Sequence, residues 1–375
     1  MNQKYEKIFQ PYKFPSGVEV KNRIMMAPMT TYSSDDQGVV TDDELAYYAE
    51  RSAGVGAVVT ACAYVSAGGK GFPGQLSADD DSFIPSLRKL AETIQSNGSK
   101  AILQIYHGGR QSPPELLPDN QPVSASAIAS NEEAPVPREM SEDEIQYVIK
   151  AFGEATRRAI EAGFDGVEIH GANTYLLQQF FSPHSNRRTD NWGGTLGQRL
   201  IFPLTIVNEV EKTVAEHAKK PFIIGYRLSP EEGSNPGITL DDTIQFVDRL
   251  ANQNLDYLHI SVGHFWNGSF RESNRTKSRI VKIYDKVGNR IPVVGVGSLH
   301  TPDEVAEAME TGVPFIALGR ELLMEPHWIE KIRSGKEAEI RTTLSKKDQD
   351  ELVIPDPLWE KLIGIKGWLP VVSDC

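Results

Sequence analysis

The sequence predicts a single (β/α)8 barrel, a TIM barrel, and three observations favour this fold. Eight short runs rich in Val and Ile are typical of strands that are covered on both faces. Helical patterns lie between these runs, as in a parallel sheet. No run is followed by the G-x-G-x-x-G fingerprint of the doubly wound sheet, which is the alternative fold. A chain of 375 residues has room for one large barrel or two ordinary domains, and we expect the barrel.

The eight predicted strands are continuous apolar runs spread along most of the chain. They are Arg23–Met29, Gly56–Ala63, Lys100–Tyr106, Gly166–His170, Phe222–Leu228, Tyr257–Val262, Pro292–Gly297 and Phe315–Gly319. Before them, residues 9–20 alternate weakly around a Pro-Ser-Gly turn, which predicts a hairpin. We expect one domain over residues 1–375, with the barrel at about 22–335 and a tail at about 336–375.

The helices between these strands carry start and stop signals. A Ser or Thr followed three residues later by Glu predicts a capping box, in which both side chains bond free N–H groups of the first turn. Such boxes are expected at Thr41, Ser141 and Thr301, with a weaker version at Thr239. A glycine between a helix and the next strand favours a left-handed helix end. This pattern occurs at Gly54, Gly163 and Gly312.

Two connections are longer than a barrel needs. His107–Met140 follows the third strand and is rich in Pro, Ser and Ala, and Phe180–Gly194 follows the fourth. Long loops in compact domains often act as lids over a site. Both connections leave the carboxyl ends of strands, where barrels place their active sites, so we expect them to border one pocket.

Composition and charge exclude several classes of function. A net charge of −12 argues against nucleic acid or an anionic membrane as a partner. No apolar signal or membrane-spanning run is evident, so we expect a cytoplasmic protein. Cys62 and Cys375 make neither a disulfide framework nor a metal cluster. No strand ends in Lys, and no His/Asp/Glu set has metal-ligand spacing, which disfavours Schiff-base aldolases and metal hydrolases.

Three polar side chains follow the fourth predicted strand within six residues. His170, Asn173 and Tyr175 offer three neutral hydrogen-bond donors, and Tyr175 can also release its proton. This set suits a substrate oxygen that becomes negative during reaction. The alternative is that these residues only satisfy a turn, as single His or Asn residues after a strand usually do.

Other predicted strand ends suggest an anion site. Gly297 and Ser298 follow strand seven, and Gly319 and Arg320 follow strand eight, where such barrels often bind phosphate. Turn geometry alone is the alternative for the glycines. Arg227 ends an otherwise apolar strand, so its charge needs an anion or a polar ring nearby, or a structural ion pair with a carboxylate.

These residues resemble the Old Yellow Enzyme family of FMN-dependent oxidoreductases, bacterial ene-reductases among them. The resemblance extends from about Asn22 to Trp328. Its most specific segments are residues 170–176, 179–183 and 186–194, with support from residues 22–23, 27–30, 104–110 and 319–323.

The resemblance implies an FMN in the barrel mouth. Pro28, Met29, Thr30 and Ala61 would line its ring, and Gln104 and Arg227 would contact its polar edge. A cation near the N1–C2 region stabilises the reduced, anionic flavin. Gly297, Ser298, Gly319 and Arg320 would hold the phosphate, in agreement with the site inferred above.

The resemblance also implies a reaction. NADH or NADPH would reduce the flavin first, and an α,β-unsaturated carbonyl compound would then accept hydride in the same pocket, a ping-pong cycle. His170 and Asn173 would bind the carbonyl oxygen, and Tyr175 would protonate the α-carbon. The motifs assign no chemistry to Asn186, Arg188, Asp190 and Trp192, which match a structural loop.

The chain departs from its relatives at two points. Thr30 replaces a cysteine that tunes the flavin in one bacterial branch, so tuning by a thiol is not expected here. Two cysteines cannot ligate the iron–sulfur cluster of larger relatives, so we expect electrons directly from a nicotinamide.

Two other functions stay open on the sequence alone. One is a flavin oxidoreductase with quinone, nitro or oxygen acceptors, and the other is a flavin-free barrel that binds a phosphate ligand. A homo-oligomer is possible, because Trp359 and Trp368 in the tail can cover a barrel end or meet another subunit.

Overall fold

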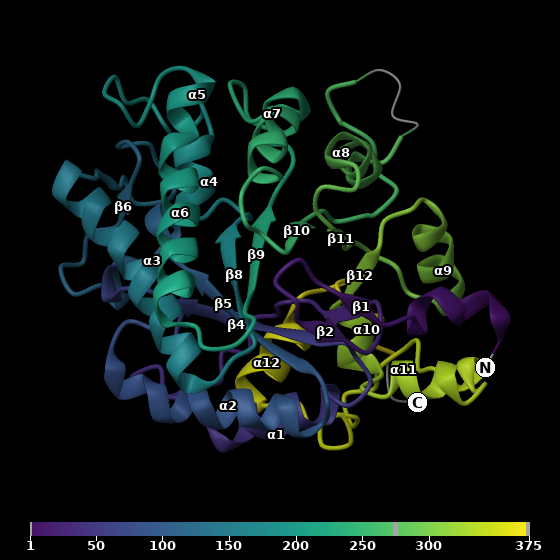
Figure 1. Cartoon of the computed structure of the whole chain (residues 1–375). Helices are drawn as coiled ribbons and strands as arrows, with labels where there is room; N and C mark the ends of the chain where they lie inside the picture. The colour runs from purple at the N-terminus through teal and green to yellow at the C-terminus, as the bar shows by residue number, and fades with distance from the viewer. Residues whose placement is uncertain (1, 273–276, 373–375) are drawn as a thin grey trace.

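The computed structural model describes residues 2–272 and 277–372 and confirms the predicted barrel. Eight parallel strands close on themselves in the order β10-β11-β12-β3-β4-β5-β8-β9, with helices around the outside (Figure 1). Cys375 lies outside the described residues. The closed order means that each strand pairs on both edges, which is the feature that separates a barrel from a doubly wound sheet.

All eight predicted strands are present, and several are shorter than the apolar runs that predicted them. The barrel strands are β3 (Ile24–Met26), β4 (Ala57–Tyr64), β5 (Lys100–Tyr106), β8 (Gly166–Gly171), β9 (Ile223–Leu228), β10 (Tyr257–Ile260), β11 (Val293–Gly295) and β12 (Phe315–Leu318). Every residue of β3, β8 and β9 is buried. Their continuous apolar character therefore reflects cover on both faces.

The helices pack their apolar faces against the outside of the barrel. They are α1 (Asp42–Arg51), α2 (Ile84–Ser96), α3 (Glu142–Ala162), α4 (Leu176–Phe181), α5 (Leu196–Arg199), α6 (Ile201–His217), α7 (Leu240–Leu250), α8 (Arg279–Val287), α9 (Pro302–Glu310), α10 (Arg320–Met324), α11 (Trp328–Arg333) and α12 (Asp356–Gly364). In α3, Ile145, Val148, Ile149 and Phe152 recur at three- and four-residue spacing and are buried.

The predicted helix caps are mostly correct. Complete capping boxes form at Ser141 and Thr301, and the weaker candidate Thr239 also forms one, with Asp242. The box at Thr41 is wrong. Thr41 does cap α1, but the side chain of Glu44 turns inward instead of reaching back to the cap.

The carboxylate of Glu44 is recruited by the loop after β3. It accepts hydrogen bonds from Thr31 Oγ1 at 2.5 Å and Ser34 Oγ at 2.6 Å, and the residue is 1% exposed. Burial raises the pKa of Glu44, and the two hydroxyl donors offset part of the cost of burying its carboxylate. Glu44 therefore ties helix α1 to the loop that leaves β3.

Two of the three predicted left-handed glycines are confirmed. Gly163 has φ +91° and Gly312 has φ +94°. Gly54 is wrong as a left-handed end, since it does not have a positive φ. Glycine is needed here for a different reason. A Cβ at Gly54 would lie 2.7 Å from Ile329 Cβ, so the absence of a side chain permits α11 to approach the backbone at Gly54.

The predicted hairpin closes the amino-terminal end of the barrel. It consists of β1 (Tyr12–Lys13) paired with β2 (Glu19–Val20). Phe14 between these strands stacks on Phe315 of β12, with ring centroids 5.1 Å apart. Because apolar side chains fill this end of the barrel, a ligand has to enter from the carboxyl ends of the strands.

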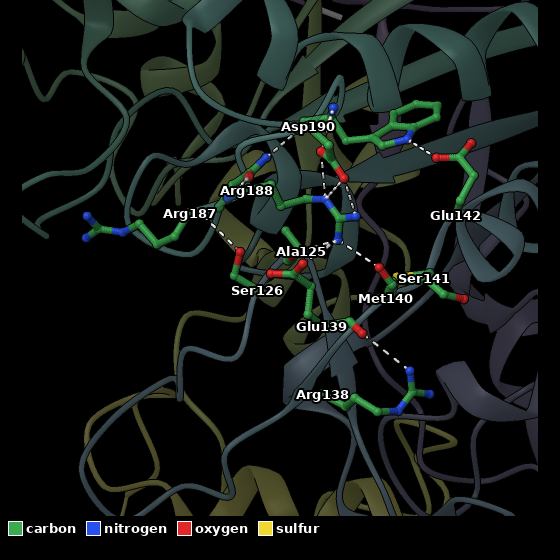
Figure 2. Close-up of polar contacts among 12 residues, drawn as sticks. Ala125, Ser126, Arg138, Glu139, Met140, Ser141, Glu142, Arg187, Arg188 and Asp190 are labelled. Atoms are coloured by element: carbon green, nitrogen blue, oxygen red, sulfur yellow. Dashed lines mark hydrogen bonds and ion pairs between the residues drawn. The ribbon is translucent and has the colours of Figure 1, made fainter.

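The two long connections are bound to each other. Strands β6 (Val123–Ser124) and β7 (Arg138–Glu139) form a small separate sheet within the first connection. Arg188, from the second connection, donates to the backbone oxygens of Ala125 and Met140 and pairs with Asp190 (Figure 2). Arg188 is buried, so the cross-link is structural, in keeping with the absence of any chemistry assigned to it.

A bulge in β4 redirects the side chains at the barrel mouth. Ala57 and Val59 point into the barrel, but the pairing with β5 shifts register between Val59 and Cys62. After the shift, Cys62 and Tyr64 cluster with Tyr106 at the mouth. A single extra residue reverses the alternation of a strand, which explains why Cys62 and Tyr64 face the mouth although Val58, before the shift, packs outside the barrel.

Candidate active site

A cavity of about 560 Å³ opens at the carboxyl ends of the strands, within the size range of ligand pockets. It brings together seven residues predicted from the sequence: Pro28, Met29, Arg227, Gly297, Ser298, Gly319 and Arg320. Gly367 and Trp368 also line it. The C-terminal tail therefore covers this end of the barrel, one of the two roles that the sequence left open for it, while Trp359 is buried in the main apolar cluster.

Arg320 and Ser298 form one end of the cavity. Arg320 Nη2 donates to Ser298 Oγ at 2.6 Å, and its Nη1 donates to the backbone oxygen of Trp368 at 3.2 Å. Ser298 Oγ in turn donates to the backbone oxygen of Gly263 at 2.8 Å. The contacts fix the guanidinium at the cavity wall, where a phosphate would find both charge and hydrogen-bond donors.

Two glycines shape the same end. Gly297 has φ +136°, and a Cβ there would lie 2.8 Å from the backbone oxygen of Val262. A Cβ at Gly319 would lie 2.9 Å from Met29 Sδ. Both positions lack room for a side chain, so the backbone itself is exposed to whatever occupies the cavity.

Arg227 lies deeper in the barrel and is 8% exposed. Its Nη2 donates to Ser261 Oγ at 3.1 Å, while its buried Nε has no hydrogen-bond partner among the described residues. Within residues 2–272 and 277–372, no carboxylate lies within ion-pair distance of it. A direct structural ion pair, the alternative raised by the sequence, is therefore not found, and part of the guanidinium remains available to a ligand.

A buried carboxylate below Arg227 was missed by the sequence analysis. Glu168 accepts from Gln104 Nε2 at 2.7 Å, from Tyr257 Oη at 2.9 Å and from His259 Nδ1 at 2.9 Å. Burial opposes ionisation of Glu168, but the hydrogen bonds from His259 and Gln104 and the charge of Arg227 outweigh it and lower the pKa of the carboxyl group. The signal in the sequence was one acidic residue inside the apolar run that became β8.

His170 and Asn173 have their orientations fixed by their other hydrogen bonds. His170 Nδ1 accepts from the backbone N–H of Ala172 at 3.2 Å, which leaves Nε2 to carry the hydrogen. Burial, and then Arg227, lower the pKa of His170 to about 3, so the ring is neutral near pH 7. Asn173 Oδ1 accepts from Ser261 Oγ at 2.9 Å, which leaves its Nδ2 free to donate.

Tyr175 completes this group. Its ring meets His170 edge to face with centroids 5.0 Å apart, and it meets Tyr106 in the same way at 4.5 Å. Burial raises the pKa of Tyr175, with further contributions from Cys62 and Tyr32. The phenol therefore remains protonated at neutral pH and can act as a proton donor.

Six predicted residues do not line this cavity: His170, Asn173 and Tyr175, described above, and Ala61, Gln104 and Thr30. Ala61 sits in the β4 bulge and its N–H donates to Tyr48 Oη at 2.7 Å. Gln104 is 2% exposed and is held by Glu168, and Thr30 is half-buried next to Met29. Their roles toward a flavin stay predictions.

The residues present fit FMN. The fixed guanidinium of Arg320 and the bare backbone at Gly297 suit the phosphate, and the partnerless Nε of Arg227 suits the polar edge of the ring. In the described part of the chain, no group of His, Cys, Asp and Glu side chains could hold a metal ion. No described helix is long and apolar enough to cross a membrane.

Comparison with known proteins agrees with this geometry. A model of the NADH:flavin oxidoreductase / NADH oxidase family matches residues 7–339. The chain is 48% identical, over 99% of both chains, to the probable NADH-dependent flavin oxidoreductase YqiG of Bacillus subtilis (strain 168). It is also similar in structure to the old yellow enzyme homologue from Zymomonas mobilis, with a TM-score of 0.75 and 25% identity over 88% of this chain and 92% of the other.

A third relative is much longer than this chain. The NADH:acrylate oxidoreductase of Vibrio harveyi is 45% identical over 92% of this chain, which spans 35% of that protein's length. The family match removes the flavin-free phosphate-binding barrel from the functions left open by the sequence. The chain belongs to the NADH:flavin oxidoreductase / NADH oxidase family, and is an enzyme of the Old Yellow Enzyme type that uses FMN with NADH or NADPH as electron donor.

Proposed function

We propose that this enzyme reduces the C=C bond of α,β-unsaturated carbonyl compounds, using NADH or NADPH in a ping-pong cycle. The observation that carries the proposal is the orientation of His170 and Asn173. Each has its acceptor atom occupied by a protein donor, so each keeps an N–H group to donate, and the His170 ring lies against Tyr175. Two neutral donors and a half-buried phenol match a reaction in which an oxygen gains negative charge and a carbon gains a proton.

The side chains then divide the chemistry between them. FMN held by Arg320 and Arg227 would supply the hydride that the β-carbon of the substrate accepts. His170 Nε2 and Asn173 Nδ2 donate to the substrate oxygen, which becomes an enolate, and each such donor is worth about 3 kcal/mol in the transition state. Tyr175 gives its proton to the α-carbon, and this general acid catalysis is worth roughly 10²–10⁴-fold in rate.

The same proposal assigns the cofactor contacts. Arg320, Ser298, Gly297 and Gly319 would hold the phosphate, and Arg227 would lie at the N1–C2 edge of the ring. Pro28, Met29, Thr30, Ala61 and Gln104 would surround the ring. The support is that most of these residues line one cavity and that Arg227 has a buried donor without a partner. Residues 1–375 would act as one domain with a small-molecule substrate.

A second candidate function is transfer of electrons to a quinone, a nitro compound or oxygen. The observation that favours it is the length of the acrylate-reducing relative, in which this chain matches only 35%. Most of that protein has no counterpart in this chain, so its name does not by itself assign alkene reduction to the segment that the two share.

Replacement of Tyr175 by Phe separates the two candidates. Under the first, Tyr175→Phe lowers the rate of cyclohexenone reduction by roughly 10²-fold or more and leaves reduction of a quinone nearly unchanged. Tyr64→Phe, in the same aromatic cluster but outside the proposed proton path, is the matched control. Equal rates of enone reduction by Tyr175→Phe and the parent enzyme would overturn the first candidate.

A further inference from the structure

A buried charge lies under the proposed flavin site without touching it. Glu168 on β8 is fully buried, and its two carboxylate oxygens accept three hydrogen bonds from Gln104, Tyr257 and His259. Gln104 and Tyr257 are neutral, and burial lowers the pKa of His259, which favours the neutral ring at pH 7. The carboxylate is therefore stabilised by dipoles, and its negative charge is not cancelled at short range.

The barrel makes room for this arrangement at Gly225. Tyr257 and His259 belong to β10, whereas Glu168 belongs to β8, and β9 lies between these strands. Gly225 of β9 pairs with both Glu168 and Tyr257, and a Cβ there would lie 2.2 Å from Tyr257 Cζ. The missing side chain lets the Tyr257 ring pass across β9 to the carboxylate, so the hydrogen bonds depend on glycine at this position.

The nearest cation in the strand register is Arg227, two residues after Gly225. Arg227 pairs with His170 on one side and His259 on the other, one layer above Glu168. Its Nη2 donates to Ser261 and not to a carboxylate, and its Nε has no partner in the described structure. The positive charge of Arg227 thus lies directly above the negative charge of Glu168. A ligand bound above Arg227 is subject to the electrostatic potential of both charges.

We propose that Glu168 is a positioning residue that sets the reduction potential of the flavin by offsetting the charge of Arg227. Arg227 stabilises the anionic reduced ring and raises the potential, and the Glu168 carboxylate opposes this effect from below. The result is a flavin that gives up its electrons more readily than one above an unbalanced guanidinium. Gln104, Tyr257 and His259 hold the carboxylate in place for this purpose.

This inference rests on the proposed placement of the flavin above Arg227, and one set of variants tests both. The measurement is the midpoint potential of the bound FMN, by anaerobic equilibration with a reference dye. Glu168→Gln removes the charge and nearly keeps the shape of the side chain. At the same ratio of reduced to oxidised dye, we expect the ratio of reduced to oxidised flavin to be about tenfold higher in Glu168→Gln than in the parent enzyme. This corresponds to a midpoint potential that is roughly 30 mV higher for a two-electron couple.

Two other variants show what a shift means. Arg227→Gln is expected to move the ratio in the opposite direction by about the same factor. Tyr257→Phe removes one hydrogen bond to Glu168 without changing its charge, and the ratio should change less than twofold. A shift in Tyr257→Phe as large as that in Glu168→Gln would mean that packing sets the potential, and it would overturn the inference.

The outcomes separate the inference from the proposed function. A shift in Arg227→Gln with none in Glu168→Gln overturns the role of Glu168 and leaves the flavin placement standing. No shift in either variant overturns the placement as well. If Glu168→Gln does not fold, infrared difference spectra of the parent enzyme labelled with ¹³C-glutamate replace it. Charge coupling is reciprocal, so flavin reduction must then shift a buried carboxylate band, and an unchanged spectrum overturns the inference.

Discussion

Arg227 and Asn173 are joined through one hydroxyl group. Ser261 Oγ accepts from Arg227 Nη2 at 3.1 Å and donates to Asn173 Oδ1 at 2.9 Å. The link connects the residue proposed to contact the flavin with a residue proposed to bind the substrate oxygen. It also decides which end of the Asn173 amide faces the substrate, so the two proposed sites share one hydrogen-bond network.

Loss of this hydroxyl should weaken catalysis without emptying the cofactor site. We expect Ser261→Ala to lower kcat/KM for cyclohexenone about tenfold, which corresponds to about 1.4 kcal/mol, because the Asn173 amide is then free to turn. FMN content should stay at the parent level. Ser334→Ala, on the exposed end of α11, is the control and should leave kcat/KM unchanged. An unchanged kcat/KM in Ser261→Ala would contradict the positioning role.

Arg320 should account for a large part of FMN affinity. Removal of a charge-assisted hydrogen bond to a phosphate is worth about 1.5–3 kcal/mol, so Arg320→Ala should raise the Kd for FMN about 10- to 100-fold. Titration of the apoprotein, followed by flavin fluorescence, measures this. Arg290→Ala is a matched control, since Arg290 pairs with Asp248 and does not line the cavity. Equal Kd values for the two variants would rule out the phosphate site.

Acid should destabilise the protein through its buried histidines. Burial lowers the pKa of His170 to about 3 and that of His107 to about 4, against about 6.5 in the unfolded chain. Below pH 6.5 the unfolded state binds protons that the folded state does not, so stability falls as pH drops from 6.5 toward 4 and 3. Above pH 6.5 both states are neutral and these groups have no effect.

The loss of stability below pH 6.5 can be measured by urea unfolding at pH 7 and pH 5. His107→Gln should reduce the difference in unfolding free energy between the two pH values relative to the parent protein. His217→Gln, which changes a histidine at the end of α6, should leave the difference as it is. A His107→Gln variant with the parent's full pH dependence would show that His107 titrates normally.

Gly225 should not tolerate a side chain. A Cβ at this position would lie 2.2 Å from Tyr257 Cζ, so Gly225→Ala has to displace the ring and its hydrogen bond to Glu168. We expect a loss of about 1–3 kcal/mol in unfolding free energy. Gly364→Ala at the end of α12, where nothing lies within 4 Å, should change stability by less than about 1 kcal/mol. Similar stabilities for both variants would contradict the close packing.

The barrel was predictable because its signals are local. Each strand is a continuous apolar run that needs no knowledge of its neighbours, and the boxes at Ser141 and Thr301 are complete within four residues. Glu44 shows where local signals fail. Its sequence context is that of a cap, but Thr31 and Ser34 come from the loop after β3 and compete for the carboxylate only once the chain is folded.

In the candidate site too, residues that are close in the sequence were predicted, and residues brought together only by folding were missed. His170, Asn173 and Tyr175 stand together in the sequence, so their grouping was visible from composition. Glu168 was missed because its partners lie 64, 89 and 91 residues away and meet it only through the register of the barrel strands. The role of Gly225 depends on the same register, and no pattern within β9 indicates it.

The central claim is that this enzyme passes electrons from a nicotinamide to an activated alkene. The most direct measurement is the visible absorption spectrum of the purified enzyme under anaerobic conditions, first with NADH and then with cyclohexenone. We expect a flavin spectrum that bleaches with NADH and returns when the enone is added. A spectrum that bleaches with NADH and stays bleached with the enone would contradict the account and favour a quinone, a nitro compound or oxygen as the acceptor.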